Sequence, residues 1–515
     1  MISAASHLTT NRTWTFRLPA WINAGVPTLQ DTHATGDRGT APAPRRAAAV
    51  ALTAILLAAF IGQFDASVIV LAVPALRDEL GATHGQAQFV LAGYTAAYAA
   101  GLVTGGRLGD LLGRRRIFQL GVTAFTLLSL TCALSPGPGA LIAARTGQGL
   151  AAALMLPQVL AIVHATFPPR ARARAVGLYG ATIGMAWIAG PLAGGALLSW
   201  NPFNLGWRAL FLINLPVGLV VALGARYAVT ESHGDRQRLD LAGAVLLAGA
   251  LYGLLLPASA AEGGDWPSWA PLAAAGGAVL LVAFWLLQRR LEARELAPLL
   301  PPRLLRQRRV ARGLVTVLAF YGGNMGFFTL VAYHVQDGLG RTPLVAGLVF
   351  SPLAAGFALG SVGSKRPHAR YGHRLLVAGA LLMAVSLAAV LAVVALAPEE
   401  SQLWWLPLPL ALSGLGEGVV AAPLIATVLG GVPARDSGAA SGVLLTATQV
   451  AHAGSVTVIG GLFVTVLGET HGGASEFASY ARATSTGCAV VLVLALLTAL
   501  AARRLGPEPR SAGGG

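Results

Sequence analysis

The chain has 515 residues, of which 55% are apolar and only 11% are charged, and its mean hydropathy is +0.66. An ordinary soluble domain has about 25% charged residues, so this composition excludes a water-soluble globular protein. The formal net charge of +15 would suggest a nucleic-acid partner in a soluble chain, so the positions of the charges decide what it means.

Residues 1–46 carry proline, glycine, threonine and scattered arginine but no apolar run. They lack the apolar core of a signal peptide and are too polar to span a membrane. We expect a disordered cytoplasmic tail here and a second, shorter tail at residues 504–515.

From residue 48 onward, long apolar runs alternate with charged or Pro/Gly-rich breaks. A helix needs about 20 apolar residues to cross a bilayer, and lipid permits only helices or closed barrels. Runs of this length are too long for strands, so we predict an all-α integral membrane protein. Its fourteen predicted spans are 48–76, 87–106, 117–135, 139–165, 173–199, 207–228, 240–261, 268–288, 311–336, 343–363, 374–397, 403–431, 438–467 and 482–503.

The basic residues lie mostly in alternate loops. Of the 36 lysines and arginines, 31 fall in the termini and in the loops after even-numbered spans. Because cytoplasmic loops retain positive charge, both termini are predicted to be cytoplasmic. Topology therefore accounts for the net charge, and no nucleic-acid partner is expected. The five basic residues outside the termini and these loops are Arg77, Arg208, Arg341, Arg482 and, within the fourth span, Arg145.

The loop from Gln288 to Arg312 holds eight arginines around Pro301 and Pro302. One interpretation is a solvated linker held at anionic lipid headgroups. The other is a hinge that lets two halves of the protein rock.

Other functional classes lack their signatures. Cys132 and Cys488 lie inside apolar runs, which does not favour a disulfide framework or a thiolate metal site. The sequence has no Gly-x-x-x-x-Gly-Lys-Ser/Thr phosphate loop and no recognisable nucleophile with its base. We therefore expect neither an enzyme nor a cofactor.

A glycine- and arginine-rich loop, Gly-Gly-Arg-Leu-Gly-Asp-Leu-Leu-Gly-Arg-Arg-Arg at residues 105–116, follows the second span. Its glycines permit a tight turn, Asp110 can cap the following helix, and the arginines can pair with acidic groups. We call residues 105–116 the gate loop. It resembles the loop signature of the major facilitator superfamily at Gly106, Arg107, Leu108, Asp110, Gly113, Arg114 and Arg115. It departs from that signature at Leu111.

A weaker copy of this pattern occurs at residues 363–374, after the tenth span. Two related halves are typical of rocking transporters. The resemblance implies a major facilitator-type fold with six helices at 47–228, two linking helices and a basic loop at 229–310, and six helices at 311–503.

Arg145 lies within the fourth span, where an arginine costs a few kcal/mol at the bilayer centre unless it is paired or hydrated. The segment resembles the superfamily's helix-4 motif at Arg145, Gln148 and Gly149, which implies a role in proton coupling. The alternative is an arginine that snorkels to the outer interface.

The fifth span contains Ala186-Trp-Ile-Ala-Gly-Pro-Leu-Ala-Gly-Gly, which we call the antiporter segment. Small residues four apart let helix backbones approach closely, and a proline removes one helical hydrogen bond. The segment resembles the antiporter motif of exporters in this superfamily, although Ala186 stands where glycine is usual. The matching residues are Gly190, Pro191, Gly194 and Gly195. Ordinary small-residue packing is the alternative.

Asp65 is flanked by apolar residues within the first span. A carboxyl in such surroundings can hold a proton or a cationic substrate. Asp65 and Pro74 resemble the helix-1 motif of the fourteen-helix drug:proton antiporters. Further matches, Trp207, Arg208, Phe211, Asn214, Pro216, Gly218, Tyr333, Gln336, Gly340, Pro343 and Gly347, extend the likeness over about residues 48–500.

Glu417 is a second acid inside a predicted span, with glycines on both sides that are expected to leave room for a ligand. It is predicted to bind protons or substrate, and a carboxyl paired with a neighbouring helix is the alternative. Gln449 and His452 are three residues apart and share a helix face, although a lone histidine is more often a satisfied hydrogen-bonding group. The polar residues expected to face the cavity are Tyr94, Asn324, Gln449 and His452.

These resemblances imply a monomeric plasma-membrane antiporter that exports small amphipathic molecules, driven by the proton gradient and without a cofactor. Drugs, antibiotics, dyes, siderophores or a secreted metabolite all remain open as substrates. The alternatives are a proton symporter or an exporter dedicated to one metabolite or siderophore. A membrane enzyme or a sensor would need features that the sequence lacks.

Overall fold

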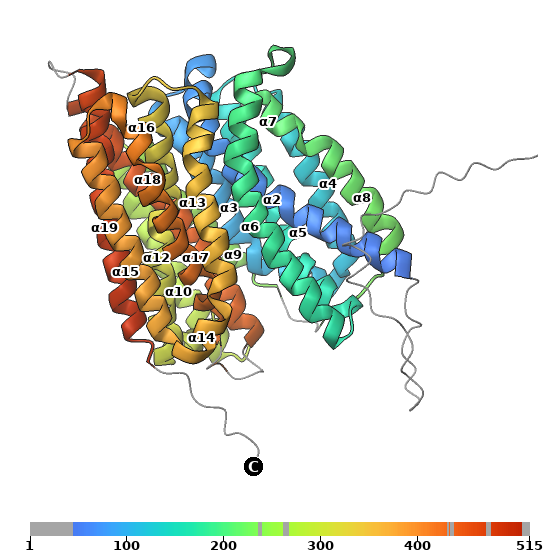
Figure 1. Ribbon diagram of the computed structural model, residues 1–515. Coiled ribbons are helices and arrows are strands. Elements are labelled where there is room, and N and C mark those ends of the chain that lie inside the picture. The colour runs from blue at the N-terminus through green and yellow to red at the C-terminus, as the bar shows by residue number, and fades with distance from the viewer. Residues whose placement is uncertain are drawn as a thin grey trace, which may run out of the picture.

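The computed structural model describes residues 45–234, 239–260, 267–429, 432, 437–469 and 475–506. Within these ranges every regular element is a helix, so the predicted all-helical fold is confirmed. Figure 1 shows long helices packed side by side, with their ends at two opposite faces of the molecule. The predicted tails at 1–46 and 504–515 lie almost wholly outside the described residues.

The N-terminal half comprises residues 45–228. Thr83 begins its second helix with a capping box, in which the Thr83 hydroxyl accepts from the Gln86 amide and the Gln86 side chain accepts from Thr83. The helices are α2 (Arg45–Leu80), α3 (His84–Leu112), α4 (Arg114–Ala133), α5 (Pro138–Thr166), α6 (Pro169–Trp200), the short α7 (Arg208–Leu212) and α8 (Asn214–Ala228).

The C-terminal half comprises residues 308–503. A π-helical turn, η2 (His334–Gly338), ends its first helix, and Thr342 caps the next with Pro343 at the first helical position. The helices are α12 (Arg308–Tyr333), α13 (Pro343–Gly363), α14 (Lys365–Tyr371), α15 (His373–Leu396), α16 (Gln402–Trp405), α17 (Pro407–Leu429), α18 (Ser437–Glu469) and α19 (Glu476–Arg503).

Two further helices, α9 (Leu241–Ala260) and α10 (Ala270–Ala293), connect the halves. They cross where Gly253 and Gly277 meet backbone to backbone. The Tyr252 hydroxyl lies 2.8 Å from the Gly93 carbonyl oxygen of α3, so the pair is fastened to the N-terminal half. The division of the chain at 228 and 310 remains a prediction.

Thirteen helices of the described chain are long and apolar enough to cross a membrane. α9 corresponds to the seventh predicted span, 240–261, but its apolar stretch, Leu241–Pro257, is shorter than the others. The count of fourteen is therefore approximate.

Beyond α10, the loop touches both halves. Arg107 of the gate loop donates to the carbonyl oxygens of Ala297 and Pro298, at 2.8 and 2.6 Å. A few residues later, Leu304 of α11 (Pro302–Arg306) packs into a small apolar cluster with Ala440 of α18. The loop therefore contacts both halves, and the choice between a linker and a hinge remains a prediction.

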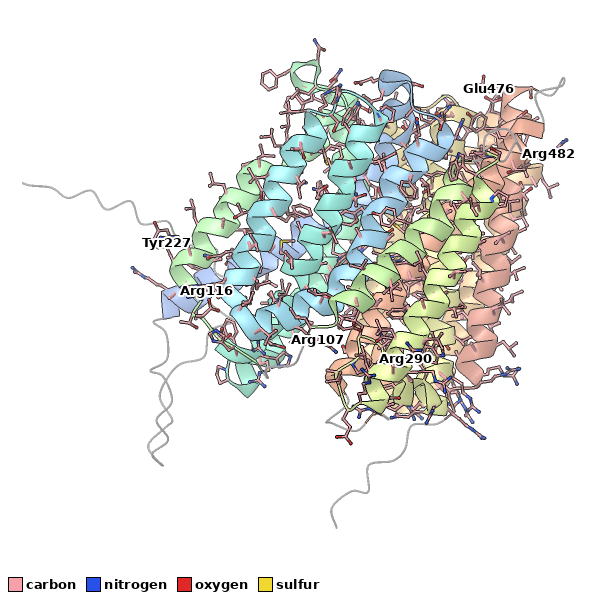
Figure 2. All side chains as sticks on the ribbon, turned by 180° about the vertical axis from the view of Figure 1, so that it is seen from behind. Arg107, Arg116, Tyr227, Arg290, Glu476 and Arg482 are labelled. Carbon is pink, nitrogen blue, oxygen red and sulfur yellow. The ribbon has the colours of Figure 1, made fainter. Side chains whose placement is uncertain are left out.

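The two ends of the helices differ in charge. Figure 2 shows Arg107, Arg116 and Arg290 at one end, and Glu476 and Arg482 at the other. We call the first the arginine-rich end and the second the opposite end.

Candidate functional site

A cavity of about 1260 Å³ lies between the two halves. It reaches the arginine-rich end, where Arg107 lies (Figure 2), and its walls there also include Arg114 and Arg303. From there the cavity extends to Glu417 and to the part of α6 around Pro191. A cavity of this size exceeds that of a typical pocket for a drug-sized ligand.

Polar residues line the inner part of the cavity. Asn324 and Glu417 both line it, and the Gln449 oxygen lies 3.1 Å from His452 Nδ1. Four of the seven residues predicted for the cavity are therefore in its lining: Asn324, Glu417, Gln449 and His452. Their roles in binding remain predictions.

Aromatic rings surround these polar groups. Trp187 of the N-terminal half stacks on Phe328 of the C-terminal half, with ring centroids 5.8 Å apart. Tyr321 meets the His452 ring edge to face at 5.2 Å. Because these aromatic residues stand in apolar helices among many others, no pattern in the sequence singled them out.

The glycines beside Glu417 do not leave room for a ligand, contrary to our expectation. A Cβ at Gly416 would lie 2.7 Å from the Gly379 oxygen of α15, and one at Gly414 would overlap the Leu353 backbone of α13. The glycines instead let α17 approach its neighbours. The cavity lies along the face of α17 that carries the Glu417 side chain.

The other three predicted residues form a separate, buried cluster. Arg145 is fully buried and pairs with Asp65, which is 1% exposed. The Arg145 guanidinium carbon also lies 4.3 Å from the centre of the Tyr94 ring. Arg145 is therefore compensated by pairing rather than by snorkelling, and neither Asp65 nor Arg145 is in the lining of the large cavity.

Two amide side chains complete the pair. Asp65 Oδ1 accepts from Asn214 Nδ2 at 2.8 Å and from Gln148 Nε2 at 3.3 Å, while Arg145 donates to the Gln148 oxygen at 2.7 Å. We call Asp65, Arg145, Gln148 and Asn214 the coupling cluster. Gln148 and Asn214 appeared only as motif matches, although the spacing of three between Arg145 and Gln148 on one helix face could have indicated the first.

The gate loop forms its predicted ion pairs in part. Asp110 accepts from Arg114 at 2.8 Å, and Glu231 lies 3.9 Å from Arg115. The expectation that Asp110 caps the next helix is wrong. Asp110 is in the last turn of α3, and Gly113, at φ +107°, occupies the cap position without a side-chain bond.

The antiporter segment packs against both halves. A Cβ at Gly190 would overlap Ser67 of α2, and one at Gly194 would lie 2.6 Å from Val68. On the next face, Gly195 meets the backbone of Pro343 in α13. The predicted close packing is present. It brings the two halves into contact between the cavity and the opposite end.

Polar contacts between the halves continue this closure. The Pro191 carbonyl oxygen lies against Gly347, and the Leu344 amide donates to Ser199 at 3.1 Å. Nearer the opposite end, Arg77 of α2 pairs with Asp337 of η2 at 3.3 Å. The structure is thus open at the arginine-rich end and closed at the opposite end.

Comparison with known proteins agrees with this architecture. The Major Facilitator Superfamily sequence model matches residues 55–456. The chain is 36% identical to the "Probable actinorhodin transporter" of Streptomyces coelicolor, over 84% of this chain and 76% of the relative. It is 35% identical to "Puromycin resistance protein pur8" of Streptomyces alboniger (79% and 80%) and 35% identical to "Cephamycin export protein CmcT" of Amycolatopsis lactamdurans (87% and 92%).

Solved structures share the fold at low sequence identity. A bacterial homologue of the human lysosomal transporter Spinster, in an inward-facing and unoccupied conformation, aligns with a TM-score of 0.64 at 16% identity, covering 92% of this chain and all of that one. A D-xylose–proton symporter aligns with a TM-score of 0.59 at 16% identity, covering 89% and 98%. The chain therefore belongs to the Major Facilitator Superfamily of multi-pass membrane transporters.

Proposed function

We propose that this protein is a proton-coupled antiporter that exports small amphipathic organic molecules by alternating access. The observation that carries the proposal is the buried Asp65–Arg145 pair, held beside a cavity that opens at only one end. Three relatives named for transport, resistance or export of antibiotics support the direction and the substrate class. Drugs, antibiotics and a secreted metabolite all fit this class.

The arginine-rich end is proposed to face the cytoplasm, because positively charged loops are retained there. Both termini then lie on the cytoplasmic side of the plasma membrane, and the cavity is in its inward-facing state. One chain contains both halves, so a monomer without a cofactor suffices. A proton symporter, or an exporter dedicated to one metabolite or siderophore, is the alternative.

Proton coupling follows from the chemistry of the pair. A proton on Asp65 removes the charge that compensates Arg145, and an unpaired buried charge is costly. The guanidinium must then find other partners, which favours a different arrangement of α2 and α5. One charge moved through 100 mV supplies about 2.3 kcal/mol, enough for more than tenfold accumulation of substrate.

The cavity adds a second acid. Glu417 is 5% exposed and lines the cavity together with Asn324 and several aromatic residues. A carboxyl in this setting can hold either a proton or a cationic group of the substrate. Competition between the two at Glu417 would link substrate release to proton uptake.

Purified protein in liposomes with an imposed pH gradient tests the proposal. Amphipathic cationic drugs are expected to release lumenal protons with the wild type and not with Asp65→Asn, because the variant cannot exchange a proton at residue 65. Glu417→Gln is expected to weaken the response to cations more than the response to neutral drugs. Proton release by Asp65→Asn at the wild-type rate would refute proton exchange at Asp65.

The ion pair at the opposite end gives a separate prediction. Arg77 and Asp337 belong to different halves, and their side chains are 22% and 19% exposed, so the pair is worth on the order of 1 kcal/mol. Asp337→Asn is expected to shift the population about fivefold toward the outward-open state. Spin labels at the exposed residues Phe203 and Trp404, one on each half, measure the distance between the two halves at the opposite end.

A charge swap provides the control. Arg77→Asp alone should open the end as Asp337→Asn does, and Arg77→Asp combined with Asp337→Arg should restore the wild-type distance distribution. If all three variants give the wild-type distribution, the pair does not stabilise the closed end.

A further inference from the structure

Asn214 occupies a distinctive position in the coupling cluster. It is the first residue of α8, directly after the break that separates α7 from α8, and it is 1% exposed. Its Nδ2 lies 2.8 Å from Asp65 Oδ1 and 3.0 Å from Ser129 Oγ. One amide nitrogen thus joins α8 to α2 and α4.

The two oxygens of Asp65 have different partners. Oδ2 faces Arg145, whereas Oδ1 accepts from Asn214 and, at a longer distance, from Gln148. Because the arginine occupies Oδ2, Oδ1 is the oxygen on which a proton can be held without first displacing the guanidinium.

We propose that Asn214 is a positioning residue for the proton-binding oxygen of Asp65, serving as hydrogen-bond donor to the carboxylate and as acceptor from the carboxylic acid. This inference rests on the proposed proton exchange at Asp65. The proton itself comes from the bulk phase through the gradient, and it adds to Oδ1 to form the O–H of a carboxylic acid.

An amide can serve both forms because it carries a donor NH₂ and an acceptor oxygen. In the structure Asn214 Oδ1 is buried and has no hydrogen-bond partner, which is unusual for a buried polar atom. When Asp65 Oδ1 gains a proton, rotation of the amide brings Asn214 Oδ1 to accept that O–H. Asn214 Oδ1, which has no partner in the structure, thus gains a hydrogen bond when Asp65 is protonated.

Ser129 supports the amide. Its Oγ donates to the Phe211 carbonyl oxygen at 3.0 Å, which leaves its lone pairs to accept from Asn214 and from Gln148 at 3.2 Å. The serine hydrogen-bonds both amides and makes no hydrogen bond with Asp65 itself. Its removal is expected to have a smaller effect than removal of Asn214.

The charged and titratable groups around Asp65 come from three other helices. Arg145 lies on α5, Tyr94 of α3 lies over the guanidinium, and Cys132 of α4 is 3.7 Å from the Gln148 oxygen. The arginines of α6 and α8 lie near the arginine-rich end of those helices, away from Asp65. The side chains that contact the Asp65 carboxyl are therefore Arg145 and the two amide donors, Asn214 and Gln148.

The pH dependence of drug-driven proton release in liposomes tests this role. Asn214→Leu removes a hydrogen-bond donor from the carboxylate, so protonated Asp65 is favoured. The midpoint, which is the pH at which proton release is half-maximal, is therefore expected to rise by roughly one unit. Asn214→Gln, which keeps donor and acceptor, should return the midpoint toward the wild type. Ser129→Ala should move it by less than Asn214→Leu does.

The matched control is Gln88→Leu, which removes another buried amide that is not hydrogen-bonded to Asp65. It is expected to leave the midpoint unchanged. If Asn214→Leu does not fold, Asn214→Asp is used, because a second carboxyl beside Asp65 also raises the midpoint.

Two negative results are distinguishable. A folded Asn214→Leu protein with reduced rate but the wild-type midpoint, together with an inactive Asp65→Asn, would overturn the role of Asn214 and leave the proposed function intact. An active Asp65→Asn would instead overturn proton exchange at Asp65.

Discussion

Arg145→Leu is expected to abolish coupled export and to destabilise the folded protein by about 3–5 kcal/mol. The arginine is fully buried, and its guanidinium bonds Asp65, Gln148 and the Val90 carbonyl oxygen. Leucine leaves the Asp65 carboxyl buried without its counter-charge. Asp65 is then held in its neutral form and can no longer cycle between the two protonation states.

A double variant separates the two effects. Replacing both members of a buried pair with apolar residues is often neutral for stability. Arg145→Leu combined with Asp65→Leu should therefore recover most of the lost stability in thermal unfolding in detergent, while proton-driven export in liposomes stays absent. Full export by the single Arg145→Leu variant would show that the pair does not couple protons to transport.

The positions of these two charges could be predicted from the sequence, but their pairing could not. A charge inside an apolar helix is costly, so Asp65 and Arg145 each had to be compensated. They lie 80 residues apart, and which faces of α2 and α5 meet depends on the packing of the surrounding helices. The same limit applies to Asn214, which contacts Asp65 although the two residues lie 149 positions apart in the chain.

Errors arose where one residue type serves two purposes. Glycines beside Glu417 were expected to leave room for a ligand, but glycine equally permits close helix packing, and the neighbouring backbones of α13 and α15 use that space. Asp110 was expected to cap the following helix, but α3 continues through Asp110 to Leu112. Local sequence patterns predict the membrane spans well. The partners and roles of individual side chains depend on contacts between helices, which these patterns do not show.

Gly195→Leu is expected to block closure of the opposite end and thereby to stop transport. A Cβ at Gly195 would lie 3.0 Å from Leu344 Cα and would overlap the Pro343 carbonyl oxygen. Both obstacles are backbone atoms of α13, so no side-chain rotation relieves the overlap. Overpacking of this kind costs about 1–3 kcal/mol, which shifts the population roughly fivefold to 150-fold toward the state in which the halves are apart at that end.

Gly184→Leu on the same helix is the matched control, because a Cβ there meets nothing within 4 Å in the structure. Spin labels at Phe203 and Trp404 should report a longer distance in Gly195→Leu and the wild-type distance in Gly184→Leu. Substrate binding should survive in Gly195→Leu while proton-driven export is lost, since the cavity residues Asn324 and Glu417 are untouched. Export at the wild-type rate would mean that the halves can close without the contact between α6 and α13, and the antiporter segment would then be packing of no consequence for the transport cycle.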